Sequence, residues 1–219
     1  MSGLKNHKKR ILIVDDHQLV RCGLRDFLQP ESDFIVCAEA GTARDALSQC
    51  ALEKPDIALV DLSLGKDNGL DLIKDIAVQF PHIKMLAVSM KDEQLYAERV
   101  LRAGASGFIG KNVSPEILIE AVRSVLDGQI YASPSVTQRM MQSIRQSSGG
   151  GSSIENLSDR ELAVFERLGA GGGTAAIAEA MSLSIKTIET YRARIKCKLN
   201  IQTSSELVQH AVQWSLEKG

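Results

Sequence analysis

Five polar side chains stand at or just after the ends of short apolar runs: Asp15, Asp16, Asp61, Ser89 and Lys111. Two adjacent carboxylates raise the electrostatic cost of one another, so Asp15 and Asp16 require a compensating positive charge. Mg²⁺ suits such a place, because it binds one or two carboxylates and completes its shell with water and phosphate oxygens. A carboxylate flanked by Mg²⁺ and a lysine can attack phosphorus and form an aspartyl phosphate. These residue types therefore predict a magnesium site whose chemistry would be the acceptance of a phosphoryl group by a carboxylate.

The elements that position these residues are predicted from the apolar pattern. Short apolar runs typical of fully buried strands occupy residues 11–14, 34–38, 57–60, 85–88 and 107–109. The segments between them have helical spacing, and Ser114 followed by Pro115 is a typical helix start, with a capping side chain before the proline. Alternating strands and helices predict a parallel sheet with helices on both faces. Because ligands bind beyond the carboxyl ends of such strands, the five polar residues should converge on one edge.

The second part of the chain has a different pattern. Residues 147–153, SSGGGSS, have the composition of a flexible linker. Beyond them, capping boxes at 158–161 and 203–206 predict two helix starts, and residues 174–181 and 184–200 form two further helical segments. These four helices predict a small bundle, and the short joint at 181–184 fits a helix-turn-helix.

Bulk composition excludes some classes of function. The 26 Lys and Arg residues nearly balance the 27 Asp and Glu residues, so a nucleic-acid partner must be met by a local basic patch. The four cysteines have neither zinc-site nor disulfide-framework spacing. Residues 11–14 are too short for a secretory core, and no apolar run approaches the length of a membrane span. We therefore expect a cytoplasmic protein with no membrane partner.

Four stretches, DDH at 15–17, VDLSL at 60–64, SMKDE at 89–93 and GFIGK at 107–111, resemble the receiver domain of two-component response regulators, over residues 9–128. The resemblance implies a flavodoxin-like five-stranded parallel sheet, and a histidine kinase as the phosphoryl donor to Asp61. The metal ligands that it implies for Mg²⁺ are Asp15, Asp16, Asp61 and Ser63. The phosphate-binding and switch residues that it implies are Ser89, Phe108 and Lys111.

Simpler roles remain open for these residues. Asp61 could be a strand-end cap, Lys111 a solvated lysine and Phe108 a core aromatic, and His17 at a helix start is more often solvated than metal-bound. The loop at 64–69, LGKDNG, departs from the receiver pattern because no proline follows the leucine. We expect its Gly65 to loosen the loop and Asp67 to add an acid near the site.

The stretches LSDRELAVFERL and IAEAMSLSIKTIETYRARIKCKL resemble the helix-turn-helix output domain of the NarL/FixJ/LuxR class of regulators, over residues 154–219, which leaves 129–153 as linker. Residues 186–198 carry five basic side chains and one acid, a patch that can neutralise DNA phosphates. Ile188, Ile195 and Leu199 should face the bundle. The expected DNA contacts are Lys186, Thr187, Glu189, Thr190, Arg192, Ala193, Arg194 and Lys196. Glu189 could accept a hydrogen bond from a cytosine amino group, or merely pair with a basic side chain of its own helix.

Other roles stay open in this domain too. The basic stretch could be a solvated helix face, and Trp214 could lie in the core or in a dimer seam. The resemblance favours a homodimer on DNA through the last helix. The glycine-rich turn at 169–173 lacks the apolar residue that the family usually has near Gly172, and this loss of packing predicts a less stable domain.

The sequence thus predicts a phosphorylation-switched transcriptional regulator that binds double-stranded promoter DNA and is not an enzyme. A phosphatase would need a general acid or base beside Asp61, and neither Ser89 nor Lys111 suits rapid hydrolysis. The sequence is also compatible with a scaffold that binds protein through its helical domain, and with a DNA-binding factor that ignores phosphorylation.

Overall fold

The computed structural model describes residues 8–138 and 154–218. The chain divides into two compact units, Met1–Arg145 and Gln146–Gly219, each with its own core. The SSGGGSS stretch, with the rest of residues 139–153, lies outside the described residues. Within the described ranges, no helix combines the length and the apolar character needed to cross a membrane.

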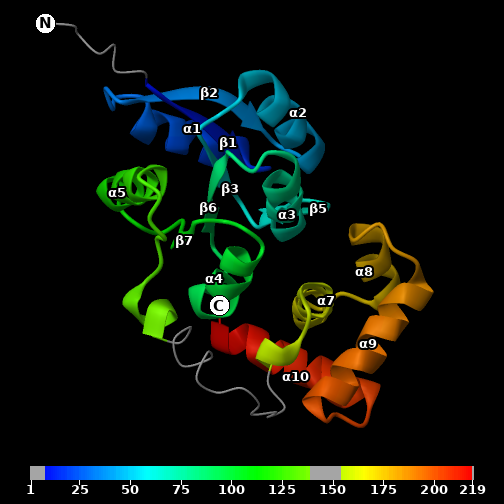
Figure 1. The fold of residues 1–219 in the computed structure, drawn as a ribbon. Helices are drawn as coiled ribbons and strands as arrows, with labels where there is room; N and C mark the ends of the chain where they lie inside the picture. Colours follow the sequence, from blue (N-terminus) through cyan, green and yellow to red (C-terminus); the bar gives the residue numbers. More distant parts are fainter. Residues whose placement is uncertain (1–7, 139–153, 219) are drawn as a thin grey trace, which may run out of the picture. The chain divides into compact units, whose positions relative to one another are not determined.

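The first unit contains the predicted parallel sheet. Its five strands pair in the order β2-β1-β3-β6-β7, and every pair is parallel. The strands are β1 (Lys9–Val14), β2 (Phe34–Ala40), β3 (Ile57–Val60), β6 (Lys84–Ser89) and β7 (Gly107–Gly110). The helices are α1 (Gln18–Leu28), α2 (Ala43–Glu53), α3 (Gly69–Gln79), α4 (Glu93–Arg102) and α5 (Pro115–Leu126). The α1 helix packs against α5, and α3 packs against α2 and α4, so the sheet is covered on both faces (Figure 1).

The core and the helix starts follow from local chemistry. One apolar cluster joins the strands to α1 and α5 through buried residues that include Ile13, Leu59 and Leu118. Asn68 caps α3 by accepting hydrogen bonds from Leu70 N–H and Asp71 N–H. The predicted start of α5 is confirmed, with Pro115 as its first residue, but the Ser114 side chain makes no capping hydrogen bond. The prediction that the Ser114 side chain caps this helix is therefore wrong.

The loop that follows Asp61 is a short hairpin. Its strands, β4 (Ser63–Leu64) and β5 (Asp67–Asn68), are antiparallel and enclose Gly65 and Lys66. Gly65 has a φ of 57°, and a positive φ at the first central position is what a type II′ hairpin turn requires. The Asp67 carboxylate accepts a hydrogen bond from Ala43 N–H at the start of α2 (2.8 Å). The expectation that Gly65 loosens this loop is therefore wrong, because the glycine permits a paired turn and Asp67 anchors it.

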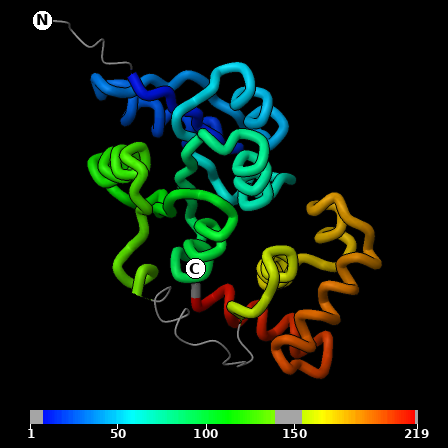
Figure 2. Tube along the Cα trace, in the orientation of Figure 1, coloured from blue at the N-terminus to red at the C-terminus, as the bar shows by residue number. Residues whose placement is uncertain are grey.

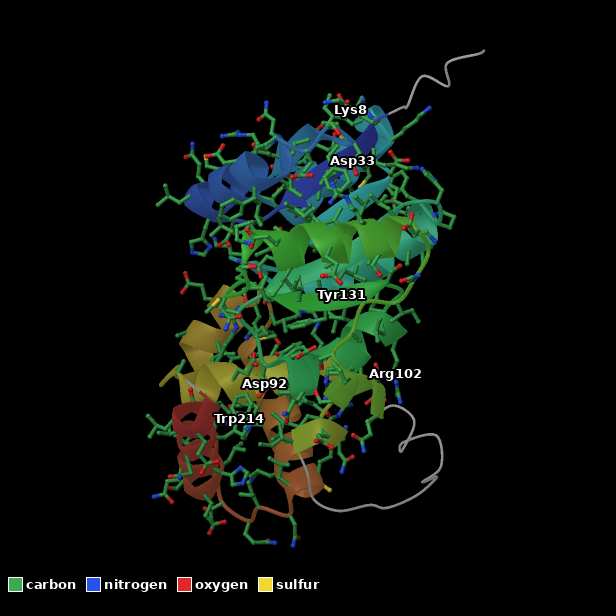
Figure 3. The ribbon with its side chains drawn as sticks, turned by 90° about the vertical axis from the view of Figure 1, so that its left-hand side faces the viewer. Lys8, Asp33, Asp92, Arg102, Tyr131 and Trp214 are labelled. Carbon is green, nitrogen blue, oxygen red and sulfur yellow. The ribbon has the colours of Figure 1, made fainter. Side chains whose placement is uncertain are left out.

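The residues that follow α5 pack against the first unit as far as they are described. Tyr131 forms a parallel bridge with Gly107, and its carbonyl accepts a hydrogen bond from Phe108 N–H (3.1 Å). Tyr131 is labelled in Figure 3. Residues 134–138 are helical, and Val136 is buried. Within residues 129–138, which the sequence pattern assigns to a linker, Tyr131 thus pairs with the edge strand β7 and Val136 is buried.

In the second unit, the described residues 154–218 form helices joined by short turns, as predicted. It contains η1 (Ile154–Asn156), α7 (Asp159–Gly169), α8 (Thr174–Ala180), α9 (Ile185–Leu199) and α10 (Ser204–Lys218) (Figure 2). Both predicted capping boxes are present, at 158–161 and at 203–206. Trp214 is half-buried, and its ring centroid lies 5.7 Å from that of Phe165 in the core, which places at least part of this side chain against its own domain.

The glycine-rich turn between α7 and α8 is built on its glycines. Gly171 has a φ of 84°. Gly172 donates a backbone hydrogen bond to Arg167 O (2.9 Å), and a Cβ at this position would come within 2.8 Å of the same oxygen. An apolar side chain at residue 172 would therefore require a different turn. The turn is thus built around Gly172, and the expectation of a less stable domain stays a prediction.

Candidate functional site

Three of the predicted residues meet at the carboxyl edge of the sheet. Asp15 follows β1, Asp61 follows β3 and Lys111 follows β7. The Lys111 ammonium lies 2.8 Å from Asp61 Oδ2 and 2.5 Å from Asp15 Oδ2. Asp15 is only 1% exposed and Asp61 only 3%. One ammonium between two buried carboxylates leaves a net negative charge in a place with little water.

The ammonium of Lys111 is held in its charged form. Burial alone would lower the pKa of Lys111, but its contacts with Asp15 and Asp61 outweigh burial, and the pKa lies above its ordinary value. The backbone N–H of Lys111 also donates to Ser89 O (3.0 Å), which ties the lysine to the end of β6.

The second oxygen of Asp61 is unsatisfied. Among the described residues, none offers a hydrogen bond to Asp61 Oδ1, although this atom is buried. A buried polar atom without a partner costs about 1–3 kcal/mol, so this oxygen favours a cation or an incoming group.

Asp16 completes the group of acids. Its Oδ1 lies 2.8 Å from His17 Nδ1, and ligand atoms of Asp15, Asp16 and His17 all lie within 4.8 Å of one another. A Cβ at Gly65 would lie 3.4 Å from Asp16 Oδ2, so the β4–β5 hairpin passes close to this carboxylate. Carboxylate oxygens suit Mg²⁺, whereas imidazole suits transition metals. In this group, Asp15 and Asp16 supply the carboxylate oxygens that suit Mg²⁺. Ser63 lies two residues past Asp61, at the start of β4, and is exposed.

The two predicted switch residues are buried nearby. Ser89 ends β6, and its hydroxyl accepts a hydrogen bond from Lys91 N–H (3.3 Å). Phe108 lies on β7, paired with Ala87, and packs in the core. Ser89 lies at the carboxyl edge with the acids, while Phe108 lies three residues before Lys111 in the chain.

The helix α9 presents two different surfaces. Ile188, Ile195 and Leu199 are buried, as predicted. The exposed candidates are Lys186, Glu189, Thr190, Ala193 and Arg194, while Thr187, Arg192 and Lys196 are partly buried. Ser184 caps the helix by accepting from Thr187 N–H (3.1 Å). The Thr190 hydroxyl donates to Lys186 O (2.9 Å), so its hydrogen is already used within the helix.

Two basic side chains of α9 hold the domain together. The Arg192 guanidinium donates to Thr174 Oγ1 at the start of α8. Lys198 pairs with the buried Glu161 (2.7 Å) and donates to Asn156 O (3.1 Å). Burial would raise the pKa of Glu161, but hydrogen bonds from Lys198 and Ser158 outweigh burial, and the pKa lies below its usual value. The capping box indicates the contact with Ser158, but no local signal in the sequence indicates Lys198.

Glu189 stands exposed between basic residues. In the part of the chain that the structure describes, no ion pair joins Glu189 to Arg192 or Arg194. The intrahelical pairing that would make Glu189 merely structural is therefore absent, and its carboxylate is available at the surface.

Two models of known families match the chain. The response regulator receiver domain matches residues 11–123, and the family described as bacterial regulatory proteins, luxR family, matches residues 155–211. The first match alone covers more than half of the chain.

Curated relatives match along nearly the whole length. Response regulator UvrY of Escherichia coli (strain K12) is 33% identical over 94% of both chains. Transcriptional activator protein ExaE of Pseudomonas putida is 34% identical over 94% of this chain and 97% of its own. Oxygen regulatory protein NreC of Staphylococcus carnosus (strain TM300) is 34% identical over 94% of this chain and 98% of its own.

Solved structures share the fold. RcsB from Salmonella enterica serovar Typhimurium, bound to promoter rprA with the phosphomimetic BeF3⁻, aligns with a TM-score of 0.68 at 23% identity, over 94% of this chain and 99% of that one. A two-component response regulator of the LuxR family from Aurantimonas sp. SI85-9A1 aligns with a TM-score of 0.58 at 29% identity, over 64% of this chain and 99% of that one. With both domain models matched in order, the chain belongs to the response regulator family, as a receiver domain followed by a LuxR-type regulatory domain.

Proposed function

We propose that this protein is a transcriptional regulator switched by phosphorylation of Asp61. The observation that carries the proposal is the asymmetry of that carboxylate: Lys111 binds Oδ2, and the buried Oδ1 has no partner among the described residues. Oδ1 is thus the oxygen available to attack phosphorus. On transfer from a histidine kinase, the Asp61 oxygen-phosphorus bond forms and the phosphorus-nitrogen bond of the phosphohistidine breaks, with the imidazole as leaving group.

Each neighbouring residue has a role in this transfer. Mg²⁺, held by Asp15, Asp16, Asp61 and Ser63, would supply positive charge to the phosphoryl oxygens. Lys111 stays charged and binds a phosphoryl oxygen after transfer. The Ser89 hydroxyl, which accepts from Lys91 N–H in the unphosphorylated chain, turns to donate to the phosphoryl group, and Phe108 moves with it. None of these residues is a general base placed for rapid hydrolysis, which favours a regulator over a phosphatase.

The DNA contacts belong to α9. We place Lys186, Glu189, Thr190 and Ala193 toward base edges in the major groove, and Thr187, Arg192, Arg194 and Lys196 toward phosphates. The Arg192 guanidinium, which already donates a hydrogen bond to Thr174 Oγ1, is one of these proposed phosphate contacts. ExaE is a transcriptional activator, and RcsB, which shares this fold, was solved on promoter DNA; structures of RcsB dimers on DNA favour a homodimer here. Such a protein acts in the cytoplasm, where kinase and promoter are both present.

Phosphoryl acceptance can be tested by mass spectrometry of the intact chain. The chain is incubated with a phosphorylated kinase domain or acetyl phosphate, with and without Mg²⁺, beside Asp61→Asn as the matched isosteric control. We expect one added phosphoryl group in the wild type with Mg²⁺ and none in Asp61→Asn. Equal labelling of both proteins would place the acceptor elsewhere and overturn the proposal.

A further inference from the structure

Asp15 makes contacts through both its backbone and its carboxylate. Its N–H donates to Ala40 O at the end of β2 (3.0 Å), and its Oδ1 accepts from His17 N–H (2.9 Å). Its Oδ2 faces Lys111. The remaining polar group is its backbone carbonyl, which accepts a hydrogen bond from Arg21 Nη1 (2.7 Å). None of the sequence motifs includes Arg21.

Arg21 connects three elements at this edge. It lies in the first turns of α1, its Nη1 reaches the Asp15 carbonyl at the end of β1, and its Nε donates to Glu39 Oε2 on β2 (3.2 Å). The Arg21 side chain is only 18% exposed. A planar guanidinium offers donors in a fixed fork, so one side chain can hold both partners at a defined separation.

A second arginine shares one of these partners. Arg25 Nη1 donates to the other oxygen of Glu39 (2.6 Å), whereas the hydrogen bond to the Asp15 carbonyl comes from Arg21. Arg25 is one helical turn further along α1 and carries the same charge. The two arginines therefore carry the same charge, but Arg21 contacts the Asp15 carbonyl whereas Arg25 contacts Glu39.

We propose that Arg21 is a positioning residue of the magnesium site: by holding the Asp15 carbonyl against Glu39, it fixes the direction in which the Asp15 carboxylate faces the metal. This inference rests on the proposed function of that site. Mg²⁺ demands near-ideal octahedral geometry, so a small rotation of one carboxylate weakens binding. Loss of an outer partner of a metal ligand typically costs about 10–100-fold in affinity.

The experiment measures metal affinity in the full-length chain, independent of phosphorylation. Free Mn²⁺ is followed by electron paramagnetic resonance, and Mg²⁺ is then titrated in as a competitor. The proteins are wild type, Arg21→Ala, Arg21→Lys and Arg25→Ala, the last as the matched control that loses a Glu39 contact without touching Asp15. We expect a loss of affinity of about 10-fold or more in Arg21→Ala, an intermediate loss in Arg21→Lys, and a change of less than about 2-fold in Arg25→Ala.

Each other outcome overturns the inference. Equal losses in Arg21→Ala and Arg25→Ala would mean that the Glu39 pairing, rather than the Asp15 carbonyl, supports the site. Full metal affinity in Arg21→Ala would mean that the Arg21 guanidinium has no positioning role. If Arg21→Ala does not fold, full metal affinity in Arg21→Lys would mean the same. The wild type tests the proposed magnesium site itself. If it binds neither Mn²⁺ nor Mg²⁺, both the proposed site and the positioning role of Arg21 are refuted; if it binds, the variants test Arg21 alone.

Discussion

Asp61 has two oxygens in different surroundings, and this difference explains most of what the site can do. Oδ2 is held by Lys111, while Oδ1 is buried without a hydrogen bond from any described residue. Together with Asp15, the carboxylates outnumber the single ammonium that contacts them both. The folded chain without metal therefore has unfavourable charge at the place where the proposed function requires a cation and a phosphoryl group to bind.

Removing one of these charges should stabilise the metal-free chain. Asp61→Asn keeps the shape of the side chain and an oxygen for Lys111, but removes the buried negative charge. We expect the free energy of unfolding of the first unit to rise by about 1–3 kcal/mol without Mg²⁺, and the stabilisation by added Mg²⁺ to shrink. Calorimetric scans with and without Mg²⁺ would measure both. A lower unfolding temperature in the variant would show that the Asp61 charge is already compensated.

Glu189 should determine one base of the operator. An exposed acid on a DNA-facing helix repels phosphates but can accept from the amino group of cytosine, whereas glutamine pairs with adenine. We expect Glu189→Gln to change the preferred base at one position from cytosine to adenine, measured by binding to operators with single base-pair changes.

The matched control for this test is Arg194→Ala. It should weaken binding to all sequences alike and reduce the salt slope by about one. If Glu189→Gln also weakened all sequences alike, Glu189 would have no role in reading bases.

At the scale of elements, an ion pair between the buried Glu161 and the exposed Lys198 joins the start of α7 to the end of α9. Glu161 has a pKa below its usual value, so its contribution to stability is complete above the unfolded pKa of about 4.3 and is lost as the pH falls through the folded pKa. We expect the difference in unfolding free energy between wild type and Glu161→Gln to shrink as the pH falls below about 5. Fluorescence of Trp214, the single tryptophan, reports this unit in urea titrations. A difference that stays constant with pH would refute the role of the ionised carboxylate.

The glycine turn gives a second prediction at this scale. Gly172→Ala places a Cβ against Arg167 O, and overpacking of this kind costs about 1–3 kcal/mol. The same Trp214 urea titration would measure the loss, with Gly173→Ala as the control, because a Cβ at Gly173 meets no atom within 4 Å. Greater stability in Gly172→Ala would mean that the position lacks packing, as the family pattern suggests.

The elements can be predicted from the sequence where their signal is local. The five apolar strands and the two capping boxes can be predicted because the pattern of each lies within a few neighbouring residues. The β4–β5 hairpin does not, because Gly65 alone indicates flexibility and the paired turn depends on Asp67 meeting α2. Arg21 and Lys198 escape prediction for a related reason, since their partners lie on other elements and no spacing within the chain encodes those contacts. The packing of residues 129–138 depends likewise on the edge of β7.

At the scale of the molecule, the two units have separate cores and separate candidate sites. The first holds the acids and Lys111, and the second holds the exposed face of α9. Phosphorylation can alter DNA affinity only if the phosphorylated receiver favours one arrangement of the chain over another, for example a dimer that presents two α9 helices to two half-sites. The proposed function therefore depends above all on coupling between the two sites.

DNA binding at fixed salt to a pool of promoter fragments, with and without Mg²⁺ and beryllofluoride as a mimic of the aspartyl phosphate, would measure this coupling. We predict tighter and sequence-selective binding of the wild type with the mimic, and no effect of the mimic on Asp61→Ala. Selective binding of the wild type that is the same with and without the mimic would contradict the proposed switch, because the receiver would then not control the DNA-binding domain.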